Sequence, residues 1–159
     1  MADDINIGSG TKTRETVTAG LSKLLADSYA VYLKTHGYHW NVEGPNFASL
    51  HTLFMTQYTE MWTAIDLVAE RIRALRSFAP QGYRAFAKLS GVQDGNPEQS
   101  SEAMLAELMG DHEALVANAR AARAAADAAG DDVTASLLDD RIEAHEKHAW
   151  MLRASLGRR

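Results

Sequence analysis

Apolar residues recur along the chain every three or four positions, which is the period of amphipathic helices rather than of strands. The first stretch with this spacing runs from about Thr16 to Val42, and Gly44 and Pro45 end it. A second helix is predicted to begin after Asn46, whose side chain can cap it. Its apolar stripe keeps a heptad-like spacing through Phe47, Leu50, Phe54, Met61, Ile65, Val68, Ile72 and Leu75.

Two further long helices are predicted in the second half of the chain. A short amphipathic segment at residues 83–89 lies within the connection that leads to them. The third helix runs from Ser100 to about Ala129, and after Gly130 the side chain of Asp131 caps the fourth. The inner side of the fourth helix is expected to hold Val133, Leu137, Leu138, Ile142, Ala149 and Leu152. Four long helices with a long second-to-third connection predict an all-α, ferritin-like four-helix bundle.

The length of 159 residues suits a single domain, so we expect the bundle to span residues 16–159 behind a flexible N-terminal tail of residues 1–15. Cysteine is absent and the first twenty residues lack the apolar run of a secretory signal, which favours a cytoplasmic location. No window approaches the roughly 20 apolar residues of a membrane-spanning helix, so no membrane partner is expected. The net charge of −5 gives no general attraction to nucleic-acid phosphates.

Two histidines and two carboxylates are the candidate chemistry of the chain. His39 lies six residues before Pro45 and His51 lies six residues after it, so a hairpin at the proline brings the two imidazoles to the same height. Asp66 and Glu70 are four residues apart and therefore share one helical face. Imidazole and carboxylate together suit divalent iron or zinc, so these four residues are the predicted metal ligands.

One copy of the chain cannot bring the four ligands together. His51 and Asp66 are fifteen residues apart on one helix, or about 22 Å, which an ion with ligands at about 2 Å cannot bridge. Two antiparallel second helices around a two-fold axis near Glu60 or Met61 would instead place His51 opposite Asp66 and Glu70 of another copy, twice over. The spacing therefore predicts two identical metal sites between subunits of a homo-oligomer.

The residues alone leave a plainer interpretation open. A histidine on a helix is most often an ordinary hydrogen-bonded polar residue. Asp66 and Glu70 can equally be solvated carboxylates, with Glu70 paired to Arg71 or Arg73.

Several motifs of the chain resemble the Dps-type mini-ferritins, the DNA-binding proteins from starved cells. The likeness rests on the run YHWNVEGPNF at 38–47, on Leu50-His51, on residues 66–72, on His145-Glu146-Lys147 and on residues 149–152. It implies a dodecameric hollow shell with ferroxidase centres between two-fold-related subunits. Ligands matching His39 and His51 would come from one subunit and those matching Asp66 and Glu70 from its partner.

The resemblance implies a protein that oxidises ferrous iron, with hydrogen peroxide as the favoured oxidant, stores the ferric product and protects against iron and peroxide chemistry. Met55 is a departure, because the family usually has an acidic ligand one turn after the second histidine. A thioether is a poor ligand for hard iron, so we expect a weakened site, with the Met55 side chain serving in packing. The alternative is a mainly structural or DNA-compacting shell with a vestigial metal site.

Acidic residues at the third-to-fourth helix turn form a second candidate site. Asp127 and Asp132 match positions that line three-fold pores in the resembling family, and Ser136 stands where a third acid often occurs. The alternative is a helix cap and a solvated face. His145 and His148 are expected to be exposed polar residues.

Direct DNA binding is not expected of this chain. The first twenty residues are not a basic arm, because they carry two basic residues, Lys12 and Arg14, against Asp3, Asp4 and Glu15. Arg153, Arg158 and Arg159 make the C-terminal end mildly positive, and many copies could add avidity. Any such binding would fade steeply with salt.

Overall fold

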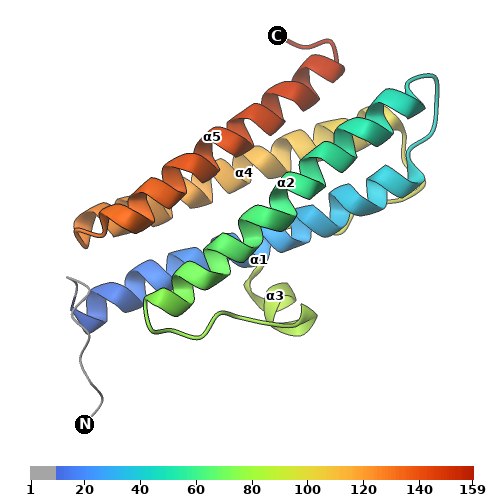
Figure 1. Ribbon diagram of the computed structural model, residues 1–159. Coiled ribbons are helices and arrows are strands. Elements are labelled where there is room, and N and C mark those ends of the chain that lie inside the picture. Colours follow the sequence, from blue (N-terminus) through green and yellow to red (C-terminus); the bar gives the residue numbers. More distant parts are fainter. Residues whose placement is uncertain (1–9) are drawn as a thin grey trace.

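Four long helices and one short helix make up residues 10–159, the part of the chain that the computed structural model describes (Figure 1). They are α1 (Thr11–Asn41), α2 (Phe47–Ala74), α3 (Tyr83–Leu89), α4 (Ser101–Ala128) and α5 (Asp132–Ser155). The predicted all-α four-helix bundle is confirmed, including the short helix in the connection between the second and third long helices.

The helix boundaries follow the predicted caps with two differences. Ser100 and Asp131 cap α4 and α5, because their side chains accept hydrogen bonds from the backbone N–H three residues further on. Asn46 precedes α2, but its side chain makes no capping hydrogen bond. α1 begins at Thr11, five residues before the expected start, so the last part of the predicted tail is helical. Residues 1–9 of that tail lie outside the described range.

The bundle consists of two antiparallel hairpins. α1 pairs with α2, α4 pairs with α5, and α1 packs against α4 to join them. Residues 75–100 run the length of the bundle from the end of α2 to the start of α4, and α3 lies beside α1 on the outside (Figure 1). This long connection is the crossover that distinguishes ferritin-like bundles from simple up-and-down ones.

The predicted apolar stripes form the core, with two exceptions. Fully buried side chains come from all four long helices and include Leu21, Leu24, Phe54, Met61, Ile72, Leu108, Leu115, Leu138 and Leu152. Phe47 and Val133 were expected on inner faces, yet they are 44% and 64% exposed. Each lies in the first turn of its helix, where the bundle ends and the facing helices cover less of the surface.

A single buried carboxylate fastens the crossover to the bundle. Asp27 on α1 accepts hydrogen bonds from Ser90 Oγ at 2.9 Å and from the backbone N–H of Gly91 at 2.8 Å. It also accepts hydrogen bonds from Lys23 Nζ at 2.7 Å and from Asn118 Nδ2 of α4 at 2.5 Å. One side chain thus ties α1, the crossover and α4 together, and its full set of donors offsets the cost of its burial.

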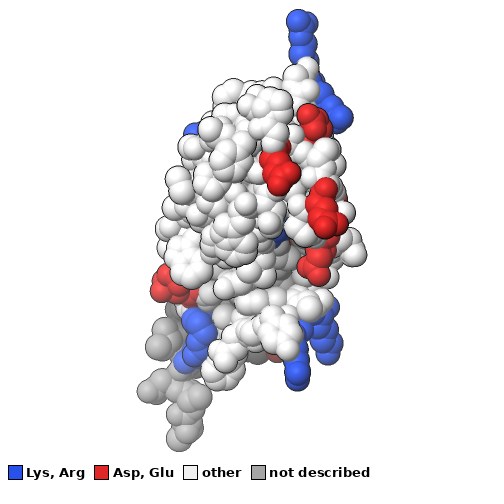
Figure 2. Space-filling view, turned by 90° about the vertical axis from the view of Figure 1, so that its right-hand side faces the viewer, with Lys and Arg blue, Asp and Glu red and all other residues white. Residues whose placement is uncertain are grey.

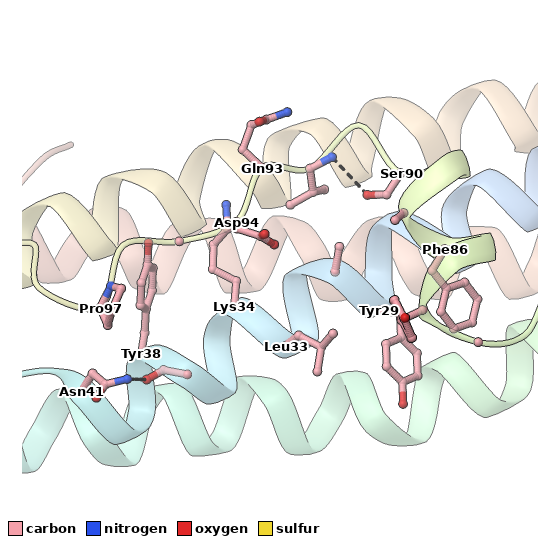
Figure 3. Close-up of a pocket in the computed structure, with 17 residues that line it drawn as sticks. Tyr29, Leu33, Lys34, Tyr38, Asn41, Phe86, Ser90, Gln93, Asp94 and Pro97 are labelled. Carbon is pink, nitrogen blue, oxygen red and sulfur yellow. Dashed lines mark hydrogen bonds between the residues drawn. The ribbon is translucent and has the colours of Figure 1, made fainter.

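A hollow of about 950 Å³ lies between α1, α3 and residues 90–97 of the crossover (Figure 3). The ring of Tyr29 stacks on Phe86 at 4.9 Å on one of its walls. None of the four predicted metal ligands lines this hollow. No helix in the described part of the chain is long and apolar enough to cross a membrane.

Candidate metal centre

His39 near the end of α1 and His51 near the start of α2 face each other across the hairpin. Their rings stack with centroids 3.6 Å apart and planes inclined by 17°. Nδ1 of His39 lies 2.6 Å from the carbonyl oxygen of His51, and Nδ1 of His51 lies 2.7 Å from the carbonyl oxygen of His39. The two residues therefore hold each other's ring by a reciprocal pair of hydrogen bonds.

These hydrogen bonds determine which nitrogen of each neutral ring carries the proton. A carbonyl oxygen only accepts, so each Nδ1 is the donor and each Nε2 keeps its lone pair. The carbonyl of His39 is available because it is among the last four of α1, which have no partner within the helix. Both Nε2 atoms are therefore in the state that binds a metal, with the backbone orienting the rings as outer partners of ligand histidines do.

Aromatic side chains surround the histidine pair. Tyr58 lies edge-on to His39 at 5.2 Å, and Phe47 lies 5.1 Å from His51. His36, one turn before His39, stacks on Tyr58 at 4.2 Å. The sequence interpretation did not place these side chains beside the histidine pair, although Phe47 precedes His51 by four residues and Tyr58 follows it by seven, which is helical spacing on one face.

The carboxylate half of the predicted site lies elsewhere on the same chain. Asp66 and Glu70 are exposed on α2, about four turns beyond His51. Across residues 10–159, no group of three or more His, Cys, Asp or Glu side chains is arranged to hold a metal ion. Within one subunit the structure thus brings the two imidazoles together and keeps the carboxylates apart from them.

The arginines next to Glu70 in sequence bind other groups. Arg71 donates to Asp131 and to the Thr134 hydroxyl, both at 2.8 Å. Arg73 donates to the carbonyl oxygen of Ser77 at 2.8 Å, and its guanidinium lies over the ring of Phe78 at 4.4 Å. These contacts weaken the alternative that Glu70 serves as an ion-pair partner for either arginine.

The outer face of α2 between the two halves of the site is apolar and exposed. Met55 is 44% exposed and Trp62 is 59% exposed, and both share the helical stripe of His51 and Asp66. The expected packing role of Met55 is therefore not met within the subunit. Met61 is fully buried, so although the predicted axis passes near its height, its side chain faces the core.

Known proteins match this chain in both fold and sequence. Residues 18–159 match the family described as Ferritin-like domain. The crystal structure of a Dps protein from Vibrio cholerae O1, described as a member of a broad superfamily of ferritin-like diiron-carboxylate proteins, matches with a TM-score of 0.92 at 31% identity and covers 98% of both chains. The chain belongs to the Dps group of the ferritin-like family.

One of the sequence relatives, named for DNA protection during starvation, supports the Dps assignment. The DNA protection during starvation protein of Brevibacillus brevis is 34% identical over 146 residues, which cover 92% of this chain and 98% of the relative. An uncharacterized low temperature-induced protein of Nostoc is 38% identical over 155 residues, covering 94% of this chain and 85% of the relative. The resemblance of the motifs to Dps proteins is thereby confirmed.

The predicted pore residues lie at the turn between α4 and α5. The surface around them is not purely acidic. Asp127 and Asp132 are both exposed there, as is Ser136. Asp127 is ion-paired with Arg123, which also donates to Asp139 at 2.5 and 3.2 Å. The sequence interpretation overlooked Arg123, whose positive charge offsets part of the negative charge of this Dps surface.

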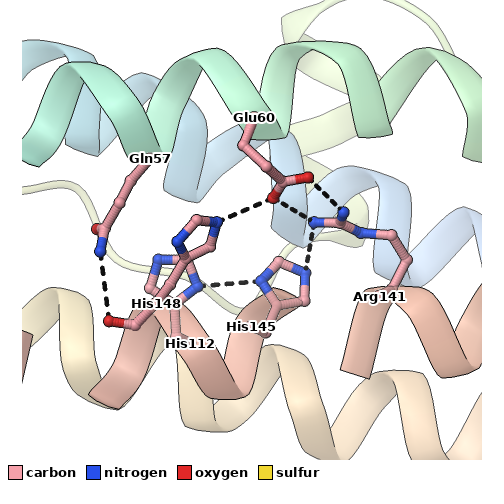
Figure 4. A network of polar contacts seen from close by, with 6 residues as sticks. All are labelled: Gln57, Glu60, His112, Arg141, His145 and His148. Carbon is pink, nitrogen blue, oxygen red and sulfur yellow. Dashed lines mark hydrogen bonds and ion pairs between the residues drawn. The ribbon is translucent and has the colours of Figure 1, made fainter. Parts of the chain in front are cut away.

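The expectation that His145 and His148 are exposed is wrong. They are 0% and 5% exposed, and they meet the fully buried His112 in the core between α2, α4 and α5 (Figure 4). The missed signal was spacing, because residues 138, 142, 145, 149 and 152 form one continuous stripe of α5 with alternating steps of four and three.

Charges on the visible surface are unevenly distributed. Figure 2 shows a face that is mostly free of charged side chains, with acidic residues toward the right-hand edge and a further acidic group at the lower left. Lysine and arginine side chains lie near the two ends of this view, including the top, where the C-terminus lies in Figure 1. No continuous basic track crosses the face that is shown.

Proposed function

We propose that the chain assembles into a closed dodecameric shell that binds and oxidises ferrous iron between subunits and stores the ferric product. The observation that carries this proposal is the reciprocal hydrogen bonding of His39 and His51, which leaves both Nε2 lone pairs for a metal. Asp66 and Glu70 of the partner subunit would complete each site. Membership of the ferritin-like family supports iron storage and protection from oxidation as the general role.

The apolar face of α2 supports the two-fold contact that this site requires. Exposed apolar patches usually mark interaction surfaces, and here Met55 and Trp62 lie between His51 and Asp66. An antiparallel copy of α2 would cover that stripe and bring each histidine pair to the carboxylates of the other subunit. The same contact would generate two equivalent sites, because a two-fold axis repeats it.

The chemistry of the site is one-electron oxidation of iron. Two ferrous ions each give one electron to one molecule of hydrogen peroxide, which takes up two protons and leaves as two molecules of water. The protein holds the iron with the imidazoles of His39 and His51 and neutralises its charge with Asp66 and Glu70 of the partner subunit. Zinc suits the same ligands and would act as a substitute that does not undergo redox change.

Met55 makes this site weaker than one with a further carboxylate. It stands one turn after His51, on the exposed side of α2, and a thioether adds no charge to hold ferrous or ferric iron. The remaining ligands supply two carboxylate charges for each site. A first iron would bind while a second would be held loosely.

Access of iron to the shell is assigned to the turn between α4 and α5. A three-fold axis there would gather Asp127 and Asp132 from three subunits into one acidic ring that attracts cations.

The absence of cysteine fits a cytoplasmic, reducing location. DNA compaction is not the proposed role, because the first twenty residues are not basic and any binding at the C-terminal arginines would be weak at ordinary salt.

Complementation between two inactive variants tests the proposal directly. One variant carries His39→Ala and His51→Ala, and the other carries Asp66→Ala and Glu70→Ala. Each alone should oxidise iron slowly with added peroxide. Co-assembled in equal amounts they should regain about a quarter of the wild-type rate, because half the two-fold pairs are mixed and each mixed pair has one intact site.

The outcomes separate the possible roles of the chain. No recovery on mixing would contradict a site shared between subunits. Wild-type rates in both separate variants would mean that these ligands do not serve iron oxidation, and would favour a mainly structural shell. A matched control replaces Glu98 of the crossover and Glu113 of α4, both exposed and away from the ligands on α1 and α2, by alanine and should keep the wild-type rate.

A further inference from the structure

Three histidines lie together in the bundle core, apart from the proposed metal ligands (Figure 4). His112 comes from α4, and His145 and His148 come from α5, with ring centroids 5.0 to 6.3 Å apart. Their side chains are at most 5% exposed. Two of the nitrogens, Nε2 of His112 and Nδ1 of His148, are buried without a hydrogen-bond partner.

The charged neighbours of the cluster assign a proton to each ring. Arg141 only donates, so Nε2 of His145, 3.4 Å away, accepts and Nδ1 of His145 carries the proton. That Nδ1 then donates to Nδ1 of His112 at 3.0 Å. The carboxylate of Glu60 only accepts, so Nε2 of His148, 2.9 Å away, is its donor. These hydrogen bonds need only one proton on each ring, and they leave the Nε2–H of His112 without an acceptor.

The cluster does not have the arrangement of a cation site. No group of three or more metal-binding side chains in the described range is placed to hold an ion. Arg141 forms a bidentate ion pair with Glu60, with atoms 2.6 and 3.0 Å apart, and its guanidinium also reaches His145. The protein itself therefore places the positive charge at this position.

We propose that His112, His145 and His148 form an acid-sensitive core that holds α5 against α2 and α4 at neutral pH and releases it in mild acid. A second proton on the pair of His112 and His145 would set two N–H donors against each other at 3.0 Å. A proton on Nε2 of His145 would face the Arg141 guanidinium instead of accepting from it. Nδ1 of His148 offers a new proton no acceptor. Each of these additions costs a contact or buries an unpaired charge.

The surrounding charged groups do not remove this sensitivity. Burial raises the pKa of Glu60, but hydrogen bonds from His148 and Arg141 outweigh it and lower the pKa to about 2, so Glu60 stays ionised through mild acid. On the other side of α4, Asp111 is ion-paired with Lys34 of α1 at 2.8 Å. Burial raises the pKa of Asp111, which favours the folded chain in acid and so opposes the effect of the histidines.

The direction of the pH effect follows from proton binding. Burial, together with neighbouring positive charge, lowers the pKa of His145 to about 3 and that of His112 well below its ordinary value. In the unfolded chain both titrate near 6.5. Below about pH 6.5 the unfolded chain therefore binds protons that the folded chain does not bind. The contribution of these histidines to the free energy of unfolding is fully present above about pH 6.5 and falls as the pH drops below it.

The test compares unfolding of the full, metal-free chain at pH 7.5 and pH 5.0, at one fixed protein concentration. For the wild type, each of His112 and His145 should raise the unfolding equilibrium constant about thirtyfold between those values. A double variant, His112→Leu with His145→Leu, should lose that part of the acid effect. Its stability at pH 7.5 should stay near the wild-type value, because both partners of the hydrogen bond are replaced by apolar side chains.

A single His145→Gln variant supplies a second measurement that keeps a polar side chain at the site. It should remove about thirtyfold of the acid effect. The matched control is His36→Gln, which removes a histidine outside the core and should leave most of the effect in place. If the double and single variants lose stability between pH 7.5 and 5.0 as steeply as the wild type, the proposal is wrong.

Discussion

His39 and His51 each donate an Nδ1 hydrogen bond to the backbone carbonyl of the other, at 2.6 and 2.7 Å. The acceptor in each case is a backbone carbonyl oxygen. It is still present when the side chain of its own residue is replaced. One imidazole therefore remains oriented when the other is removed. This independence gives the pair a recognisable response to mutation.

Replacing one histidine of the pair should weaken metal binding without abolishing it. In His51→Ala, the ring of His39 still donates to the carbonyl of residue 51 and still offers Nε2. We expect zinc affinity to fall by at least about tenfold, the lower end of the cost of losing even an outer partner of a metal ligand. Calorimetry with zinc measures this, and the double variant with His39→Ala should show no binding at the site. Loss of all binding in the single variant would contradict independent orientation of the rings.

Met55→Asp should strengthen the iron site, because it adds a charged oxygen ligand one turn after His51. We expect ferrous iron to bind at least about tenfold more tightly, equivalent to ~1.4 kcal/mol, and to be oxidised faster with peroxide. Thr56→Asp is the matched control, because it adds the same charge on an exposed position that points about 100° away around the helix. Equal gains in the two variants would indicate a general charge effect rather than ligation.

Gly95→Ala should destabilise the crossover. An added Cβ at this position would clash with the hydroxyl group of Tyr38, which accepts a hydrogen bond from Gln99 at 2.5 Å and donates one to Glu107. Such a clash in a packed region typically costs about 1–3 kcal/mol. Chemical denaturation followed by circular dichroism measures the change.

Gly37→Ala is the contrasting substitution for this experiment. Gly37 lies within α1 and has no atom within 4 Å of an added Cβ, so alanine should stabilise the chain by roughly 0.5–1 kcal/mol through helix propensity. Similar losses of stability in both variants would rule out the steric account of Gly95.

Arg123→Gln should speed the entry of iron if the turn between α4 and α5 lines a pore. Removing this guanidinium leaves Asp127 and Asp139 without their shared cation and makes the surface more negative. Iron uptake should rise at low ionic strength and the gain should shrink as salt is added, because exposed charges are screened. Asp127→Asn together with Asp132→Asn should slow uptake. Opposite changes, or none in either variant, would argue that iron enters elsewhere.

The four-helix pattern was readable from the sequence because burial repeats with the period of the helix. The stripe of α2 from Leu50 to Leu75 is buried almost as predicted, whereas Phe47 is exposed because it lies in the first turn, beyond the cover of its neighbours. Periodicity describes which way a residue points. It does not describe where the neighbouring helix stops.

The histidine pair was predictable for a local reason, and the rest of the site was less so. A hairpin at Pro45 makes His39 and His51 neighbours through short-range geometry. Arg123 beside Asp127 and the burial of His145 depend on how α4 and α5 pack, which the sequence interpretation treated as a solvated surface. His145 stands on the apolar stripe of α5, and this position was the available signal of its burial.

α2 carries residues of both the proposed iron site and the buried histidine cluster, on two different faces of the helix. Its outer stripe carries His51, Met55 and Asp66, while its inner side sends Glu60 to Arg141 and to the buried histidines. Between them lies a strip of exposed threonines at 52, 56, 59 and 63. Because one helix carries both sets of residues, a shift of α2 along its axis would move His51 and Glu60 together.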